Sequence, residues 1–142
     1  MVQNDPNNSL GGLTFYYILQ NSAGSADDIH RITINGWGNA PVMVDNVLGG
    51  GVPASIATRA NANTIGFQWE SVLLMPGYSG SFVVQTSYQT YDRTLASIID
   101  GGTATAATFA PVPIPEASTI VAGALLLLPF GVSTMRVLRK KS

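Results

Sequence analysis

Short segments rich in β-branched and aromatic residues alternate with Gly, Asn, Asp and Pro along residues 10–110. In the clearest segment, Ser81–Thr90, an extended chain places Phe82, Val84, Thr86 and Tyr88 on one side. This two-residue period, bounded by turn residues, predicts strands. The predicted strands cover residues 13–19, 30–35, 42–47, 64–69, 72–74, 81–90, 95–99 and 105–109.

No stretch before residue 117 has the sustained three-and-four spacing of an amphipathic helix. Regular short strands with such turns are typical of an antiparallel β-sandwich, so we predict an all-β domain over residues 1–110. Because the strands begin abruptly, we also expect that an N-terminal strand is missing and that a sheet edge is exposed.

The pattern changes after residue 110. A Pro-rich segment, 111–116, precedes 19 consecutive uncharged residues from Ala117 to Met135. As a helix, that run spans about 28 Å, close to the roughly 30 Å hydrocarbon core of a bilayer. Membrane helices tolerate a kinking proline such as Pro129. The alternative, an amphipathic helix packed on the domain, would need a periodic apolar stripe, whereas this run is apolar all round.

The last seven residues, 136–142, are strongly basic. Arg136, Arg139, Lys140 and Lys141 give them a local charge of +4. Basic residues next to a membrane helix stay in the cytoplasm, which would place the β-domain outside. We therefore predict a β-sandwich ectodomain at 1–110, a spacer at 111–116, one transmembrane helix at 117–135 and a cytoplasmic tail at 136–142.

The order of these elements resembles a known targeting signal. Pro115-Glu116-Ala117-Ser118-Thr119, followed by the apolar run and the basic end, is similar to the PEP-CTERM sorting signal of exported proteins in Gram-negative bacteria. That signal has a Pro-Glu-Pro motif, Ser-Thr, a transmembrane helix and an Arg-rich end. Here Ala117 replaces the second proline, and lysines share the basic end with arginines.

The resemblance implies a partner and a destination. Exosortase, a membrane transpeptidase, recognises this signal and cleaves near the motif, so the helix would be a temporary anchor in the lipid bilayer. The protein would be held in the inner membrane in transit to the cell surface or extracellular matrix. Residues 12–110 more loosely resemble a β-domain attached to such signals, through Pro76-Gly77-x-Ser79, Val83-Val84-Gln85-Thr86 and Ile99-Asp100-Gly101-Gly102. This second likeness implies architecture and no activity.

An exported protein begins with a basic region and then an apolar region. Met1–Leu10 has neither, and Phe15–Leu19 is too short to serve. We therefore expect that the native start, with its signal peptide, lies outside this sequence.

Composition limits the partners and the chemistry. Only 11% of residues are charged, against about 25% in average proteins. Residues 1–115 hold three arginines against seven acidic residues, a charge of −4 that gives nucleic acid no basic surface. The chain has no cysteine, so disulfides, thiolate catalysis and thiolate metal sites are excluded.

His30 is the sole histidine, with Asp27 and Asp28 beside it and Ser81 downstream. A Ser-His-Asp triad would need a nucleophile turn such as G-x-S-x-G, which is absent, so we interpret His30 as a residue at the entry to a strand. A zinc site would need several more ligands.

The carboxylates suggest no catalytic pair. Glu70 and Glu116 are the only glutamates, and Glu116 belongs to the sorting motif. Asp27-Asp28 and Asn4–Asn8 supply oxygen atoms that suit Ca²⁺, but Asn and Asp also favour turns, which explains the same residues. We expect no metal and no cofactor.

Aromatic residues leave one further possibility, a platform for carbohydrate. Strand aromatics usually pack in the core, although adjacent Tyr16 and Tyr17 must point to opposite faces. The aromatics weighed for a platform are Trp37, Trp69, Tyr16, Tyr17, Tyr78, Tyr88 and Tyr91. The glycine runs 49–51 and 101–102 lack the Lys-Ser/Thr of a phosphate loop and predict turns.

The sequence therefore predicts a non-catalytic exported surface or matrix protein. The alternative is a module on the same anchor that binds carbohydrate or another polymer, with extracellular polysaccharide as the partner. A secreted hydrolase is a third possibility, which the shortage of acid and base groups opposes.

Overall fold

The computed structural model describes residues 1–47 and 49–112. This described part contains nine strands and no helix. The strands are β1 Val2–Asn4, β2 Leu13–Gln20, β3 Arg31–Asn35, β4 Val42–Asn46, β5 Ile56–Asn61, β6 Thr64–Gln68, β7 Ser79–Thr86, β8 Tyr91–Ile99 and β9 Thr103–Pro111.

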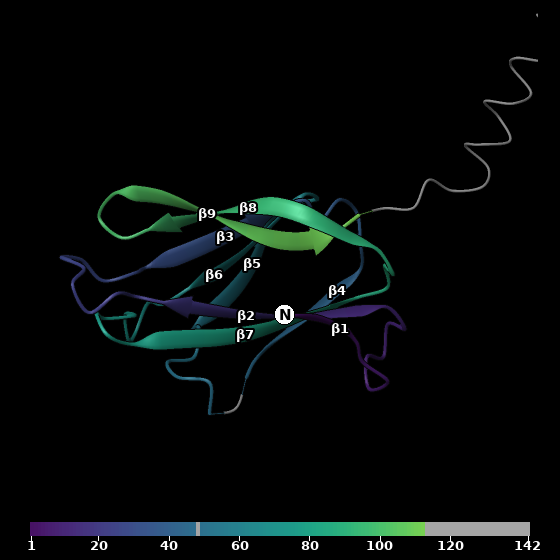
Figure 1. Ribbon diagram of the computed structural model, residues 1–142, viewed down its shortest axis with the longest axis horizontal. Coiled ribbons are helices and arrows are strands. Elements are labelled where there is room, and N and C mark those ends of the chain that lie inside the picture. The colour runs from purple at the N-terminus through teal and green to yellow at the C-terminus, as the bar shows by residue number, and fades with distance from the viewer. Residues whose placement is uncertain (48, 113–142) are drawn as a thin grey trace, which may run out of the picture.

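The strands form two antiparallel sheets. One has four strands in the order β1-β2-β7-β4, and the other has five in the order β5-β6-β3-β8-β9. In Figure 1 the five-stranded sheet lies above the four-stranded sheet, and the two enclose the core between them. The prediction of an all-β domain with packed antiparallel sheets is confirmed.

Alternation along the strands builds this core. Every second residue of β7 is buried, and Phe82, Val84 and Thr86 share one side of the strand as predicted, the side that faces the core. Phe82 stacks on Phe67 of the opposite sheet with ring centroids 3.9 Å apart, and on Tyr17 of β2 at 5.3 Å. Each large apolar side chain buried in this way contributes about 1.5–3 kcal/mol relative to an exposed one.

Two buried asparagines hold the loops at the strand ends. The Asn8 amide donates to the carbonyls of Gly12, Leu13 and Thr86, at 2.9, 3.0 and 3.0 Å. The Asn21 amide donates to the carbonyls of Asp27 and Leu74, both at 2.9 Å. A buried amide is costly without partners, so these bonds fix the loops to the sheets.

The predicted strand at 72–74 is wrong. Leu74 makes only an isolated bridge with Ile29. Leu74 is fully buried, whereas Val72 is 56% exposed, so the three apolar residues do not share one environment. Pro76 follows after Met75, and Gly77 has a positive φ of 86°, so the chain turns instead of extending.

Two strands were missed, and both lie at sheet edges. β5 exposes five of its six residues, so it lacks the apolar alternation that reveals a strand. β1 pairs Val2–Asn4 with Leu13–Phe15, so the exposed edge expected at the start of the domain is covered along that part of β2. Beyond Tyr16, β2 has no neighbour on that side among the described residues.

Several boundaries also differ from the prediction. β7 ends at Thr86 rather than at residue 90, because the Thr86 hydroxyl accepts a bond from the Tyr88 N–H at 3.3 Å and the chain turns there. β8 starts four residues before the predicted Leu95, at Tyr91. β9 ends at Pro111, a residue that the prediction placed in the spacer.

The predicted sorting motif at 115–119, the membrane helix at 117–135 and the basic tail at 136–142 lie outside the described residues. Within the residues that the structure describes, no helix is long and apolar enough to cross a membrane.

Candidate functional site

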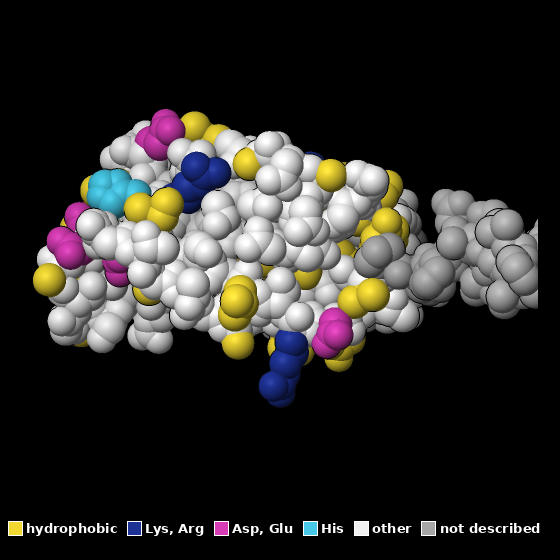
Figure 2. All heavy atoms as spheres, turned by 90° about the horizontal axis from the view of Figure 1, so that it is seen from above, with side chains coloured by type: hydrophobic (Ala, Val, Ile, Leu, Met, Phe, Trp, Pro, Cys, Tyr) yellow, Lys and Arg dark blue, Asp and Glu magenta, His cyan; other side chains and the backbone are white. Residues whose placement is uncertain are grey.

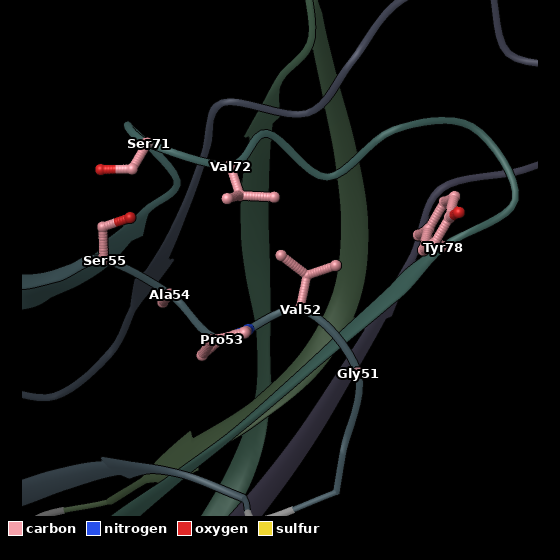
Figure 3. Close-up of a pocket in the computed structure, with 8 residues that line it drawn as sticks. All are labelled: Gly51, Val52, Pro53, Ala54, Ser55, Ser71, Val72 and Tyr78. Carbon is pink, nitrogen blue, oxygen red and sulfur yellow. The ribbon is translucent and has the colours of Figure 1, made fainter.

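The first candidate site is a surface hollow of about 520 Å³ at one end of the sandwich. It lies between the β4–β5 loop and the loop that follows β6, with Tyr78 at the start of β7. Figure 3 shows Val52 and Val72 in the middle, Tyr78 at one end and Ser55 and Ser71 at the other.

Close backbone approach shapes this hollow. The Val52 N–H donates to the Ser79 carbonyl at 2.8 Å, and the Trp69 indole N–H donates to the Val52 carbonyl at 3.2 Å. Gly51 has a φ of 99°, and a Cβ there would overlap the Ser79 carbonyl. Because only glycine fits this approach, the loop is held firmly against β7.

The hollow is suited to binding rather than to acid–base chemistry. Its lining is largely apolar. The side chains that can form hydrogen bonds are those of Tyr78, which is 53% exposed, and of the two serines. An aromatic ring with a few polar groups is typical of small-molecule sites. Tyr78 is the only titratable residue in the lining.

The sequence pointed to only part of this site. Tyr78 was among the candidate aromatics, but Val72 was assigned to a strand and Val52 was not among the candidate residues. The usable signal was the pair of Gly/Pro-rich segments on either side, residues 49–53 and 76–80, which place two loops at one end of a sandwich.

A second hollow, of about 570 Å³, runs along the open part of the β2 edge. Tyr16, Ile18 and residues 107–109 of β9 line it. Tyr17 also lines it, and its hydroxyl donates to the Phe109 carbonyl at 2.7 Å and so joins the two sheets. Burial raises the pKa of the Tyr17 hydroxyl, because the charged phenolate is poorly solvated there.

The residues weighed for a catalytic triad are not brought together. His30 is exposed and precedes β3, a strand of the five-stranded sheet. Ser81 lies in β7, a strand of the four-stranded sheet. Its backbone N–H donates to the Ile99 carbonyl at 3.0 Å, and its carbonyl accepts from the Trp69 N–H at 2.9 Å. No hydrogen bond in the described part of the chain joins the His30 side chain to Ser81, Asp27 or Asp28.

The oxygen-rich segment Asn4–Asn8 is held by turn bonds. The Asp5 carboxylate accepts from the Asn7 N–H at 2.9 Å, and the Asn8 side-chain oxygen accepts from the Leu10 N–H at 2.9 Å. Among residues 1–47 and 49–112, no three His, Asp or Glu side chains gather as metal ligands would. Glu70 is exposed at the end of β6, and Glu116 lies outside these ranges.

The candidate aromatics divide into core and surface. Trp37 and Trp69 are 0% and 1% exposed and belong to the core. Tyr17 points inward onto Phe82, while its neighbour Tyr16 lines the second hollow. Tyr78 and Tyr91 are about half exposed, and of these two only Tyr78 lines one of the two hollows.

The two glycine runs lie in connections, as predicted. Residues 49–51 belong to the β4–β5 loop, and residues 101–102 turn the hairpin between β8 and β9. Figure 2 shows the molecule from above the five-stranded sheet: the Lys and Arg side chains lie apart from one another, whereas several Asp and Glu side chains lie near the His side chain at one end.

The sorting-motif residues Pro115, Glu116, Ala117, Ser118 and Thr119 and the basic residues Arg136, Arg139, Lys140 and Lys141 lie beyond the last described residue, Val112. Comparison of the chain with protein-family models, with curated proteins and with solved structures found no match.

Proposed function

We propose that this chain is an exported, non-catalytic surface or matrix protein whose β-sandwich is delivered by a C-terminal sorting signal. The observation that carries the proposal is the order of the tail: Pro115–Thr119, then uncharged residues to Met135, then four basic residues. Such a run is more stable in lipid than in water, and the basic end would keep the sandwich on the far side.

The sandwich is consistent with this role as cargo. Its core is built around one cluster of buried apolar side chains and its loops are fixed by buried asparagines, which is consistent with a domain that folds without a disulfide. β9 ends at Pro111, the first residue of the Pro-rich segment, so little chain separates the sandwich from the motif. An exosortase-type transpeptidase would then act in the short segment between the folded domain and the bilayer.

Intact mass of the protein from its host, together with cell fractionation, tests the proposal. We expect a mature chain that ends near Pro115–Thr119 and is recovered outside the cytoplasm. Replacing Pro115 and Glu116 together by alanine should leave the chain uncleaved and held in the membrane. The matched control is Glu70→Ala, which changes the other glutamate and should leave processing normal. A mature chain that still ends at Ser142 in the soluble cytosol would refute the proposal.

A second function, polymer binding by the delivered domain, is favoured by the hollow around Tyr78. A half-exposed ring beside serine hydroxyls suits a sugar ring, which has apolar faces and a polar rim. Affinity electrophoresis in gels containing extracellular polysaccharide should show retardation that Tyr78→Ala abolishes. Tyr91→Ala is the control, because it removes an equally exposed ring away from the hollow. Equal loss in both variants would contradict a site at Tyr78.

A further inference from the structure

The described residues place four strands at the sheet edges, and three of them carry features that discourage pairing with another chain. β1 has only three residues, β4 carries Asp45, and β5 carries Arg59 and a register shift between Arg59 and Asn61. Short length, charge and bulges are the usual protections of an exposed edge.

β9 has none of these protections. It is nine residues long, it carries no charged residue, and its pairing with β8 is continuous from Tyr91↔Pro111 to Ile99↔Thr103. Its only proline is Pro111, the final residue. Such an edge is a template for strand addition.

The hydrogen-bond pattern shows which backbone groups of β9 face outward. The Val112 N–H donates to the Thr90 carbonyl at 2.9 Å, so the even-numbered residues bond to β8. Antiparallel bonding alternates, so the odd-numbered residues Thr103, Thr105, Ala107 and Phe109 face away. The Phe109 carbonyl accepts from Tyr17; the others have no partner among the described residues.

We propose that β9 is a dimerisation edge and that it pairs antiparallel with β9 of a second copy about a two-fold axis at Ala106. A two-fold contact sets a strand against itself, so any charge on it would meet the same charge nearby. Thr103–Val112 has none, which removes this repulsion. The contact joins the two five-stranded sheets into one.

The proposed register uses every outward residue of the edge. Centred on Ala106, it pairs Thr103 with Phe109 of the partner subunit, and Thr105 with Ala107 of the partner subunit. The Phe109 carbonyl can accept a second bond because a carbonyl oxygen has two lone pairs. Since the contact uses the same edge on both copies, assembly closes at the dimer.

A cysteine at the axis tests the register, because the chain has no cysteine of its own. In a non-hydrogen-bonded antiparallel pair the two Cα atoms lie about 4.5 Å apart, within the disulfide range of roughly 4.4–6.8 Å. Under mild oxidation in a non-ionic detergent, full-length Ala106→Cys should form a covalent dimer. Ala57→Cys is the matched control, since Ala57 is also exposed on an edge strand of the same sheet, β5, and it should form no covalent dimer.

Sedimentation velocity tests whether β9 is the contact. Ala107→Pro removes an outward N–H without breaking a bond to β8, and Ala106→Lys sets two cations against each other at the axis. Both should convert the full chain from dimer to monomer, whereas Ala57→Lys should leave the dimer. Circular dichroism and the fluorescence of buried Trp37 and Trp69 confirm that each variant is folded.

Three results would overturn the proposal. These are a monomeric wild-type chain at high protein concentration, a dimer that survives both β9 variants, and assembly into species larger than a dimer, which would indicate open-ended strand addition. The readouts measure association rather than processing, so the proposal stands or fails separately from the sorting function.

Discussion

The two lateral sides of the sandwich, where the sheets end, are held together in different ways. On the β4/β5 side, the Asn46 side chain exchanges two bonds with Ala54, and the Arg59 guanidinium donates to the carbonyls of Gly38, Ala40 and Ala62. On the β2/β9 side, the two sheets are joined by the Tyr17–Phe109 bond. The charged and bulged edges thus lie on the closed side, and the uncharged edge lies on the open one.

The two sides differ in how many polar side chains bridge them. Asn46 and Arg59 fix the β4–β5 side, and Arg59 also gives β5 a charge that discourages pairing. On the open side, Ile18 is 77% exposed and Phe109 39%, so apolar surface remains uncovered there. The closed side is therefore expected to dominate folding stability, and the open side to dominate association.

The largest expected effect lies in the loop of the closed side. Gly51→Ala should lower the free energy of unfolding by about 3–4 kcal/mol, because it adds both backbone strain at φ 99° and overlap with the Ser79 carbonyl. Gly49→Ala has a similar φ of 73° with no atom near the added Cβ, and should cost about 1 kcal/mol. Urea denaturation followed by tryptophan fluorescence measures both. Equal losses would show that the close approach to β7 is not rigid.

Asn46→Ala should have the next largest effect. It leaves the N–H and carbonyl of Ala54, bonded to Asn46 at 2.9 and 3.1 Å, without partners in a part-buried position. The expected loss is about 2 kcal/mol in the same denaturation assay. Asn39→Ala is the control, because Asn39 is exposed and precedes the same strand. A loss no larger than that of the control would mean that the Asn46–Ala54 hydrogen bonds do not stabilise the β4/β5 side.

Arg59→Ala should cost less, about 1–2 kcal/mol, because the guanidinium is partly exposed and water replaces some of its bonds. Arg59→Lys should recover only part of the loss, since one ammonium cannot match the fork that reaches three carbonyls. Arg93→Ala removes an exposed arginine of β8 and should change little. If Arg59→Lys is as stable as the wild type, charge rather than fork geometry is responsible.

Most of the fold followed from alternation, and the failures share one cause. Strands with one buried face, such as β3 and β7, alternate clearly because burial selects apolar residues at every second position. β1 and β5 lie at edges, bury little and so leave no pattern. At Val72–Leu74 an apolar run proved to be a loop: Leu74 is buried and makes only an isolated bridge with Ile29, while Val72 is exposed.

The surface sites were harder to predict than the core. Trp37 and Trp69, which lie just after β3 and β6, are buried, in agreement with the expectation that most of the aromatics pack in the core. The hollow at Tyr78 forms where two loops meet, and β9 is an edge because of the strand order. Neither the meeting of the loops nor the strand order can be predicted from the local pattern of apolar and polar residues. The charge-free stretch Thr103–Val112 was visible in the sequence, but its meaning required knowing that β9 lies at an edge.

On the open side, Tyr17→Phe should cost about 0.5–1.5 kcal/mol at neutral pH, because it removes the bond to the Phe109 carbonyl and keeps the ring stacked on Phe82. Tyr16→Phe should cost less, since the Tyr16 hydroxyl has no partner among the described residues. If Tyr17→Phe were as harmful as Asn46→Ala, the open side would be held as firmly as the closed one.

The pH dependence of the same variant is the finest test of this comparison. Burial raises the pKa of Tyr17 in the folded state above the ordinary value of about 10, so in alkali the unfolded chain ionises first and binds fewer protons. Stability from this group is therefore complete below about pH 10 and falls by about 1.4 kcal/mol per pH unit above it. Tyr17→Phe lacks this loss, so the variant, less stable at pH 7, should overtake the wild type near about pH 11. If the difference in unfolding free energy between Tyr17→Phe and the wild type instead stays constant from pH 7 to about pH 11, the hydroxyl is open to water. The two sheets would then not be closed at Tyr17.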